Sequence, residues 1–324
     1  MTEYSLAASK KYYRSLEPLV QPTAHPRPLD WAGLFGRKAP LEVEIGFGNG
    51  EYTVKWAAVN TDSLMIGLEV SFPCVARCAR RSGKAGLSNL KIICADARFM
   101  MKELFADESL DMVIMNFPCP WPKTRHAKYR VTAKEFADSL AAVLKTGGAF
   151  ELVTDEEWYA AEVQKTLSGH EALSVSGCEK GFARSLTTKY ERKWLEMGKT
   201  ITRLTVAKTK KFTVGRQMWG GATVHVKTGK PLPEKGLAFL SRASGARDGA
   251  LWVFKGYYAA GIGNGKNFLV ETVASDGEFE QRCYLKVVER DGDTMVKLDG
   301  TAKVFLTPAV RFAVEDLARR LAEA

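Results

Sequence analysis

Residues 111–126 read DMVIMNFPCPWPKTRH, an apolar run that passes directly into a proline-rich loop. The first part, from Asp111 to Met115, has the composition of a buried strand. Three prolines within five positions, Pro118, Pro120 and Pro122, fix the backbone dihedral angles where this strand ends. A stiff loop at the end of a buried strand predicts the rigid edge of a pocket.

A cluster of positive charge follows the prolines. Four Lys or Arg residues occur within eight positions, with His126 among them: Lys123, Arg125, Lys128 and Arg130. Such a density of positive charge favours contact with nucleic-acid phosphates. Solvated charges on an ordinary stiff connection would give the same pattern, so other signals are needed to separate the two interpretations.

The bulk composition is that of a globular protein with a polyanionic partner. The chain has 324 residues, 46% of them hydrophobic and 26% charged, which suffices for two domains with a substantial core. Its net charge of +10 favours a partner such as nucleic acid. No segment approaches the roughly 20 apolar residues of a membrane span, so we expect a cytoplasmic protein. The six cysteines are scattered without metal-site spacing, so we expect reduced thiols and no metal.

Apolar strands alternate with helical stretches between residue 41 and about residue 206. We expect strands at 41–47, 64–69, 90–94, 111–115 and 149–154, helices ending near 59, at 73–85, at 132–144 and from 156, and a final antiparallel pair within 190–206. This alternation predicts an α/β fold, a doubly wound parallel sheet with its ligand at the carboxyl ends of the strands.

The chain divides into three parts by composition. Residues 1–40, with four prolines spaced over residues 18–28, predict an extended segment. Residues 41–208 are expected to form the α/β domain, and residues 212–324 a smaller α+β domain after the basic link 207–211. The last part is strand-rich and ends in a helix that begins after Thr307-Pro308 and has one apolar face. We find no catalytic constellation in it, and its role and the oligomeric state are not determined by the sequence.

A glycine-rich turn follows the first strand of the α/β domain. Gly46, Gly48 and Gly50 lie between this strand and its helix, but the third glycine comes one residue earlier than in a dinucleotide fingerprint. Glu44 also places a negative charge near the position of the pyrophosphate that such a turn would bind. An acidic residue here favours a cationic cofactor.

Two more carboxylates end the next two strands. Glu69, about 20 residues further on, is placed to accept hydrogen bonds from ribose hydroxyls, and Asp96 is placed to bind an adenine amino group. Either residue alone would be an ordinary solvated carboxylate. Carboxylates at three successive strand ends suit an adenosyl sulfonium that carries an ammonium group, and therefore indicate S-adenosylmethionine.

These motifs together resemble the bacterial tRNA (guanine-N7)-methyltransferase family. The resemblance covers residues 38–206 and rests on EIGFGNG (44–50), Glu69, Ala95-Asp96-Ala97, NFPCPWPKTRHAKYR (116–130), Thr154-Asp155 with Tyr159, and Thr188-Lys189-Tyr190-Glu191. It implies a class I methyltransferase fold that transfers a methyl group from S-adenosylmethionine to N7 of a guanine in the tRNA variable loop. Beyond about residue 210 the resemblance does not extend.

The resemblance also implies roles for individual residues. The cofactor would be held by Glu44, Gly46, Gly48, Glu69, Asp96 and Cys119. The target guanosine or its flank would be contacted by Lys123, Arg125, Asp155, Thr188 and Glu191. One departure stands out, because the family has an aspartate, usually given the catalytic or cofactor-positioning role, where this chain has Cys119.

The chemistry tolerates this departure in principle. Guanine N7 has a free lone pair and needs no deprotonation, so alignment of the two reactants is the main requirement. A carboxylate would help by bonding the guanine edge and by stabilising the charge that develops on the ring, and a thiol does this poorly. We expect activity to survive because Asp155 and Glu191 orient the base.

Two alternatives remain open from the sequence. Pro118-Cys119 also resembles the nucleophile of cytosine C5-methyltransferases, in which a thiolate adds to the pyrimidine ring. If the absence of the family aspartate has abolished catalysis, the chain would instead be a non-catalytic tRNA-binding module. Methyl transfer to tRNA followed by nucleoside analysis distinguishes all three.

Overall fold

The computed structural model describes most of the chain as two compact units. The described residues are 17–123, 125, 130, 133–184, 186–216, 224–234, 236–240, 242–259, 267–301 and 304–324. The units comprise Met1–Arg216 and Gln217–Ala324. Residues 1–16, His126 and Lys128 lie outside the described residues, so the expectations placed on them have no structural counterpart here.

The first unit contains a seven-stranded sheet in the order β3-β2-β1-β4-β5-β7-β6. Its elements are α2 (Trp31–Phe35), β1 (Leu41–Ile45), α3 (Glu51–Val59), β2 (Leu64–Glu69), α4 (Phe72–Ala85), β3 (Leu90–Cys94), α5 (Ala97–Leu104), β4 (Leu110–Asn116), α6 (Lys134–Val143), β5 (Leu144–Thr154), α7 (Glu157–Ser168), β6 (Leu173–Lys180), α8 (Lys189–Glu196) and β7 (Thr202–Lys208). The first five strands are parallel, and β7 is antiparallel to both β5 and β6. The doubly wound sheet predicted from the sequence is confirmed.

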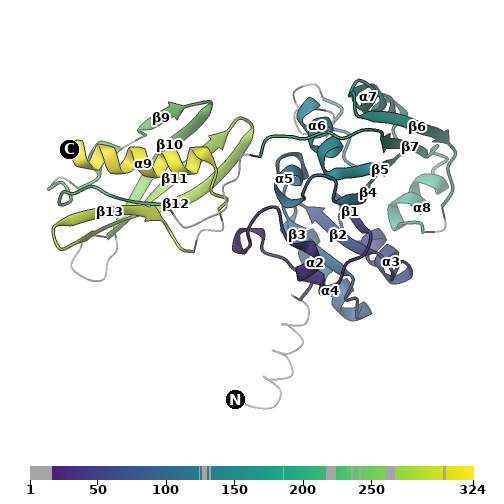
Figure 1. Ribbon diagram of the computed structural model, residues 1–324, viewed down its shortest axis with the longest axis horizontal. Coiled ribbons are helices and arrows are strands. Elements are labelled where there is room, and N and C mark those ends of the chain that lie inside the picture. The colour runs from purple at the N-terminus through teal and green to yellow at the C-terminus, as the bar shows by residue number, and fades with distance from the viewer. Residues whose placement is uncertain are drawn as a thin grey trace, which may run out of the picture. The chain divides into compact units, whose positions relative to one another are not determined.

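Helices cover both faces of this sheet (Figure 1). Helices α3 and α4 pack together on one face, and α5, α6 and α7 form a row on the other. The order of the strands reverses between β1 and β4, so the ends of these two strands open the crevice in which ligands of such folds bind. The proline-rich loop begins there, directly after β4.

The expected antiparallel pair within residues 190–206 is wrong in its first half. Residues 189–196 form helix α8, and the partner of β7 is β6, Leu173–Lys180. The side chain of Thr188 accepts a hydrogen bond from the backbone N–H of Glu191, and the Glu191 side chain accepts one from the backbone of Thr188. This reciprocal capping box starts a helix where apolar alternation alone indicated a strand.

The third glycine of the turn has a packing role. Gly50 is the N-cap of α3 and has a φ of 71°. A Cβ atom at this position would lie 2.2 Å from the Sγ atom of Cys78 in α4. Gly50 therefore lets α3 and α4 approach closely, which explains why a glycine follows so soon after Gly48.

The first described residues of the chain and the last residues of the first unit are attached to the surface of that unit. The backbone of Val20 donates to the carbonyl of Ile92 at 2.9 Å, which adds residues 17–20 to the edge strand β3. Near residue 216, the Arg216 guanidinium donates to the carbonyls of Lys102 and Phe105 and pairs with Asp107 at 2.6 Å. The compact first unit thus extends past the basic link at which we expected its boundary.

The second unit is a six-stranded antiparallel sheet in the order β8-β13-β12-β11-β10-β9, with helix α9 across one face (Figure 1). Its elements are β8 (His225–Lys227), β9 (Ser244–Arg247), β10 (Ala250–Ala259), β11 (Asn267–Asp276), β12 (Phe279–Arg290), β13 (Asp293–Leu298) and α9 (Pro308–Glu323). The predicted apolar positions of α9, Val310, Val314, Leu317 and Leu321, are all buried. The smaller strand-rich α+β domain is therefore confirmed.

Within the described residues, no helix is long and apolar enough to cross a bilayer. The same ranges contain no group of three or more His, Cys, Asp or Glu side chains placed to hold a metal ion.

Candidate active site

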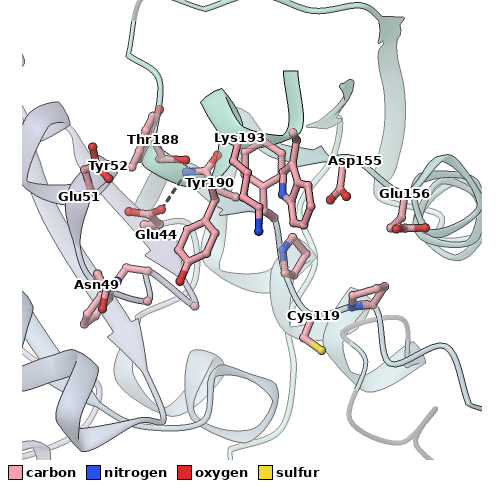
Figure 2. Close-up of a pocket in the computed structure, with 18 of the residues that line it drawn as sticks. Glu44, Asn49, Glu51, Tyr52, Cys119, Asp155, Glu156, Thr188, Tyr190 and Lys193 are labelled. Atoms are coloured by element: carbon pink, nitrogen blue, oxygen red, sulfur yellow. Dashed lines mark hydrogen bonds between the residues drawn. The ribbon is translucent and has the colours of Figure 1, made fainter. Parts of the chain in front are cut away.

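A cavity of about 710 Å³ opens at the carboxyl ends of β1, β4 and β5. One side, which we call the glycine wall, is formed by Glu44, Gly46, Gly48, Tyr52 and Asn116. The other side, the α8 wall, is formed by Asp155, Glu156, Tyr190, Lys193, Trp194 and Lys199. The proline-rich loop, Phe117 to Pro120, also lines the cavity, and Figure 2 shows Cys119 there.

The glycine wall is centred on a buried carboxylate. Glu44 in β1 is 2% exposed and accepts hydrogen bonds from the Thr53 hydroxyl and, at 2.8 Å, from the Asn116 amide. Burial raises the pKa of Glu44, and the hydrogen bonds from Thr53 and Asn116 oppose this shift. Both donors are neutral and the nearby charge of Arg184 does not cancel the effect of burial, so a cationic ligand in the cavity would add favourable charge beside Glu44.

Two glycines keep the backbone of this wall open. Gly46 and Gly48 have φ values of 70° and 55°, a region that favours glycine. A Cβ atom at either position would meet nothing within 4 Å. The open space next to these residues is part of the cavity, so a ligand can approach the backbone itself.

The other two predicted cofactor carboxylates lie off the cavity walls. Glu69 is 9% exposed and accepts from the backbone N–H groups of Gly48 and Ser71, both at 2.9 Å. It therefore fixes the shape of the glycine turn. Asp96 caps α5 by accepting from the Arg98 backbone and pairs with the Arg98 side chain at 2.6 Å. Binding of ribose by Glu69 and of adenine by Asp96 remain predictions.

The proline-rich loop has an unusual backbone. Phe117 and Trp121 have φ values of 49° and 47°, which are costly for large side chains, at about 1–3 kcal/mol each. Arg130 holds the loop by donating to the carbonyls of Pro120 and Trp121, and it pairs with Glu162 at 2.8 Å. Arg130, counted above among the phosphate-binding charges, thus stabilises the loop internally.

The two other described basic residues of this stretch, Lys123 and Arg125, lie outside the cavity lining. Lys123 and Arg125 are exposed on the chain that follows the prolines. Their exposure leaves them accessible to a large anionic substrate. Contact of Lys123 and Arg125 with RNA remains a prediction.

Partly buried ion pairs centred on Lys199 dominate the α8 wall. The ammonium of Lys199 bonds Asp155 and lies 3.1 Å from Glu156. The hydrogen bond that Lys199 donates to Asp155 raises the pKa of Lys199. Asp155, predicted to contact the target guanosine, therefore lines the cavity with one cation already beside it.

Arg184 joins the two walls and is the functional residue that sequence patterns missed. Its guanidinium donates to the Asn116 amide oxygen at 2.7 Å and pairs with Glu191 at 2.9 Å. Arg184 also lies over the Tyr52 ring, 4.6 Å from its centroid. The chain from Glu44 through Asn116 and Arg184 to Glu191 runs from β1 to α8, across more than 140 residues of sequence.

This chain of contacts changes how two predicted substrate residues are used. Glu191 is 1% exposed and is occupied by Arg184 and by the capping box. Thr188 lines the cavity, but its side chain accepts the hydrogen bond from Glu191 in the same capping box. The cavity thus brings together six of the predicted residues, Glu44, Gly46, Gly48, Cys119, Asp155 and Thr188, while Glu191 lies behind its wall.

Comparison with known proteins gives one consistent set of relatives. Residues 38–204 match the model of a family described as putative methyltransferase. The chain is 38% identical over 306 residues to a tRNA (guanine-N(7)-)-methyltransferase of Thermotoga maritima, covering 93% of this chain and 96% of that protein. It is 40% identical over 152 residues to a tRNA (guanine-N(7)-)-methyltransferase of Yersinia enterocolitica, covering 47% of this chain and 64% of that protein.

The matches to the Thermotoga maritima and Yersinia enterocolitica proteins cover different lengths of this chain. The Thermotoga maritima match must run into the second unit, since the first unit ends at residue 216 of 324. Among solved structures, a 16S rRNA methyltransferase, KamB, is 15% identical with a TM-score of 0.43, covering 56% of this chain and 93% of that chain.

Proposed function

The chain belongs to the tRNA (guanine-N(7)-)-methyltransferase family, and on this premise we propose that it methylates N7 of a guanine in the variable loop of tRNA. The methyl donor is S-adenosylmethionine. The observation that carries the proposal is the cavity between the glycine wall and the α8 wall, which opens at the strand ends of a doubly wound sheet. With tRNA as substrate, the enzyme works in the cytoplasm.

The glycine wall fits a cationic amino-acid nucleoside. Gly46 and Gly48 leave the backbone accessible, and Glu44 offers a carboxylate that has only neutral hydrogen-bond donors. A negatively charged pyrophosphate beside Glu44 would be repelled, whereas an ammonium group would be attracted. Glu69 supports this site by holding Gly48 in place.

S-adenosylmethionine supplies an electrophilic methyl group when it is bound. Guanine N7 would accept the methyl group through its own lone pair, so no residue of this chain is needed as a general base. What the residues of this chain contribute is alignment of the base and exclusion of water. The left-handed backbone at Phe117 and Trp121, held by Arg130, gives the loop between the two walls a fixed shape for this purpose.

The base is oriented from the loop and the α8 wall. Asp155 and Cys119 both line the cavity, and Asp155 carries the negative charge that Cys119 lacks. A carboxylate near the guanine stabilises the positive charge that develops on the ring as N7 is methylated. We assign this role to Asp155, with Lys199 setting the position of its carboxylate.

The test is methyl transfer from labelled S-adenosylmethionine to unmodified tRNA, followed by digestion to nucleosides. We expect 7-methylguanosine as the labelled product. Chain cleavage at 7-methylguanosine, followed by sizing of the fragments, then locates the modified position, which we expect in the variable loop.

Other products would overturn the proposal in distinct ways. Labelled 5-methylcytidine would assign Cys119 to nucleophilic chemistry instead. Binding of tRNA without methyl incorporation would make the chain a binding module. Label in 7-methylguanosine outside the variable loop would keep the activity and reject only the position.

A further inference from the structure

Helix α8 is attached to the protein by polar contacts. Glu191 and Thr188 form its capping box, Arg184 pairs with Glu191, and Arg192 lies 3.5 Å from Glu51 of α3. Lys55 adds a hydrogen bond to the Thr187 carbonyl at 3.1 Å. These contacts fix the first turn and one side of the helix.

The apolar side chains of α8 take no part in a core. Tyr190 is 56% exposed, Leu195 is 49% exposed, and Trp194 is half-buried. Large aromatic residues normally gain most of their stabilisation from burial. Packing therefore does not account for Tyr190 and Trp194.

Tyr190 and Trp194 instead share the face of α8 that lines the cavity. They are four residues apart, so they lie one above the other on the helix, and both contribute to the α8 wall. Figure 2 shows Tyr190 and Lys193 reaching from α8 into the space between Glu44 and Asp155. The two aromatic side chains thus face the glycine wall across the cavity.

The Trp194 ring is held in place by two lysines. The ammonium of Lys199 lies 4.5 Å from its centroid and that of Lys193 lies 5.3 Å away. Gly198, with a φ of 72°, lets the chain turn so that the Lys199 backbone donates to the Trp194 carbonyl at 2.9 Å. Lys199 is itself fixed by Asp155, which leaves the indole little freedom to move.

A fixed aromatic face with adjacent cations suits unpaired RNA. Bases that are not stacked in a helix bind to aromatic side chains whatever their identity, while lysines contact the phosphates. The residues that fit the cofactor are on the opposite wall, so this face is not needed for the nucleoside part of S-adenosylmethionine. The target guanine is assigned above to Asp155 and Cys119, so we assign this face to a nucleotide next to it.

We propose that Tyr190 and Trp194 form a stacking platform for an unpaired base that flanks the target guanine, with Lys193 on the adjoining phosphate. The proposal rests on the function proposed above and adds how the RNA is held. By placing one neighbour of the guanine, the platform determines how the target base enters the cavity.

The test uses the full-length enzyme with Trp194→Ala and Tyr190→Ala, and with Leu195→Ala as the matched control on the same helix. At saturating S-adenosylmethionine, each aromatic variant should raise the KM for tRNA about 10-fold, since stacking on one ring contributes on that order. Trp194→Phe and Tyr190→Phe should keep most of the affinity. Leu195→Ala, which removes a residue outside the cavity, should change nothing.

Two binding measurements separate this role from a structural one. Calorimetry should give the same affinity for S-adenosylmethionine in wild type and in all variants. Equilibrium binding of tRNA without cofactor should be weakened by Trp194→Ala with an unchanged salt dependence, whereas Lys193→Ala should lower the slope of log affinity against log salt by about 1.

The platform is rejected if Trp194→Ala and Tyr190→Ala bind tRNA as wild type does, or if Leu195→Ala is equally impaired. Loss of cofactor affinity in the aromatic variants would also reject it. Failure of the proposed function shows differently, as wild-type enzyme that forms no 7-methylguanosine. In that case, the tRNA-binding series still decides whether the platform exists.

Discussion

The glycine wall and the α8 wall enclose the same cavity but are built by different physical means. The glycine wall positions Glu44 with buried hydrogen bonds between side chains of β1, α3 and β4. The α8 wall positions Asp155 and Trp194 with the ammonium of Lys199, which is partly open to solvent. Salt screens a buried network less than it screens ion pairs that solvent reaches. The surface offered to the cofactor thus depends on buried hydrogen bonds, and the surface offered to the RNA depends on ion pairs that salt weakens.

Arg184→Ala would break the link between the walls and should have the largest effect. It leaves Glu191, which is 1% exposed, as a buried and unpaired carboxylate, which costs about 3–5 kcal/mol. Denaturant unfolding followed by a signal from the first unit measures the loss.

The double variant Arg184→Met with Glu191→Gln is the control, because it removes both charges and leaves an amide oxygen at position 191 to accept the capping-box hydrogen bond from the Thr188 backbone. It should recover most of the stability and still bind the cofactor weakly, since Asn116 loses its partner. Full recovery of cofactor affinity would mean that the walls are not coupled.

Gly50→Ala and Gly48→Ala compare two glycines of one turn. At Gly50 the new Cβ would lie 2.2 Å from Cys78 Sγ and only 3.0 Å from its Cα, at a φ of 71°. We expect a loss of about 3 kcal/mol in unfolding free energy and little protein folded at 37 °C.

Gly48→Ala meets open space, so it should cost about 1 kcal/mol of stability and mainly weaken cofactor binding. Thermal unfolding and calorimetric titration of both variants measure the contrast. Equal destabilisation by the two substitutions would contradict the different roles assigned to these glycines.

Glu44→Gln should separate stability from function within the glycine wall. It removes a buried charge, and the Thr53 hydroxyl can rotate to accept from the new amide. We expect the unbound protein to gain about 1 kcal/mol and to lose affinity for S-adenosylmethionine about 30-fold or more.

The difference in unfolding free energy between wild type and Glu44→Gln should depend on pH. Burial raises the pKa of Glu44, so the folded wild type loses stability relative to Glu44→Gln as pH rises through the ordinary carboxyl range and up to the raised pKa. At lower pH both side chains are neutral and the difference should vanish. Unfolding curves from pH 4 to 8 that stay parallel for the two proteins would be inconsistent with a raised pKa.

Cys119→Asp lies between the walls and should have the smallest effect. Alignment supplies most of the rate in methylation of N7, so an added carboxylate should raise turnover several-fold or leave it similar. Cys119→Ser controls for loss of the thiol. A collapse of methyl transfer in both variants, with cofactor binding intact, would give the thiol a role of its own.

The sequence by itself determined the sheet, the glycine turn and the family. Alternating strands and helices of ordinary length predict a parallel sheet, and Glu44 with Gly46 and Gly48 predicts a cationic nucleoside at its edge. The NFPCPWPKTRHAKYR run, residues 116–130, is the most specific sequence signal of the family. These signals are local, since each depends on residues close together in the chain.

Only the tertiary structure decided which charges are free to bind a ligand. The sequence predicted phosphate contact for Arg130 and contact with the target guanosine for Glu191, but folding pairs them with Glu162 and Arg184. The start of helix α8 could have been predicted from the sequence, because Thr188 and Glu191 have the spacing of a capping box. The pairing of Arg184 with Asn116 had no local signal, because a contact between residues 68 positions apart is set by how the strands and helices pack.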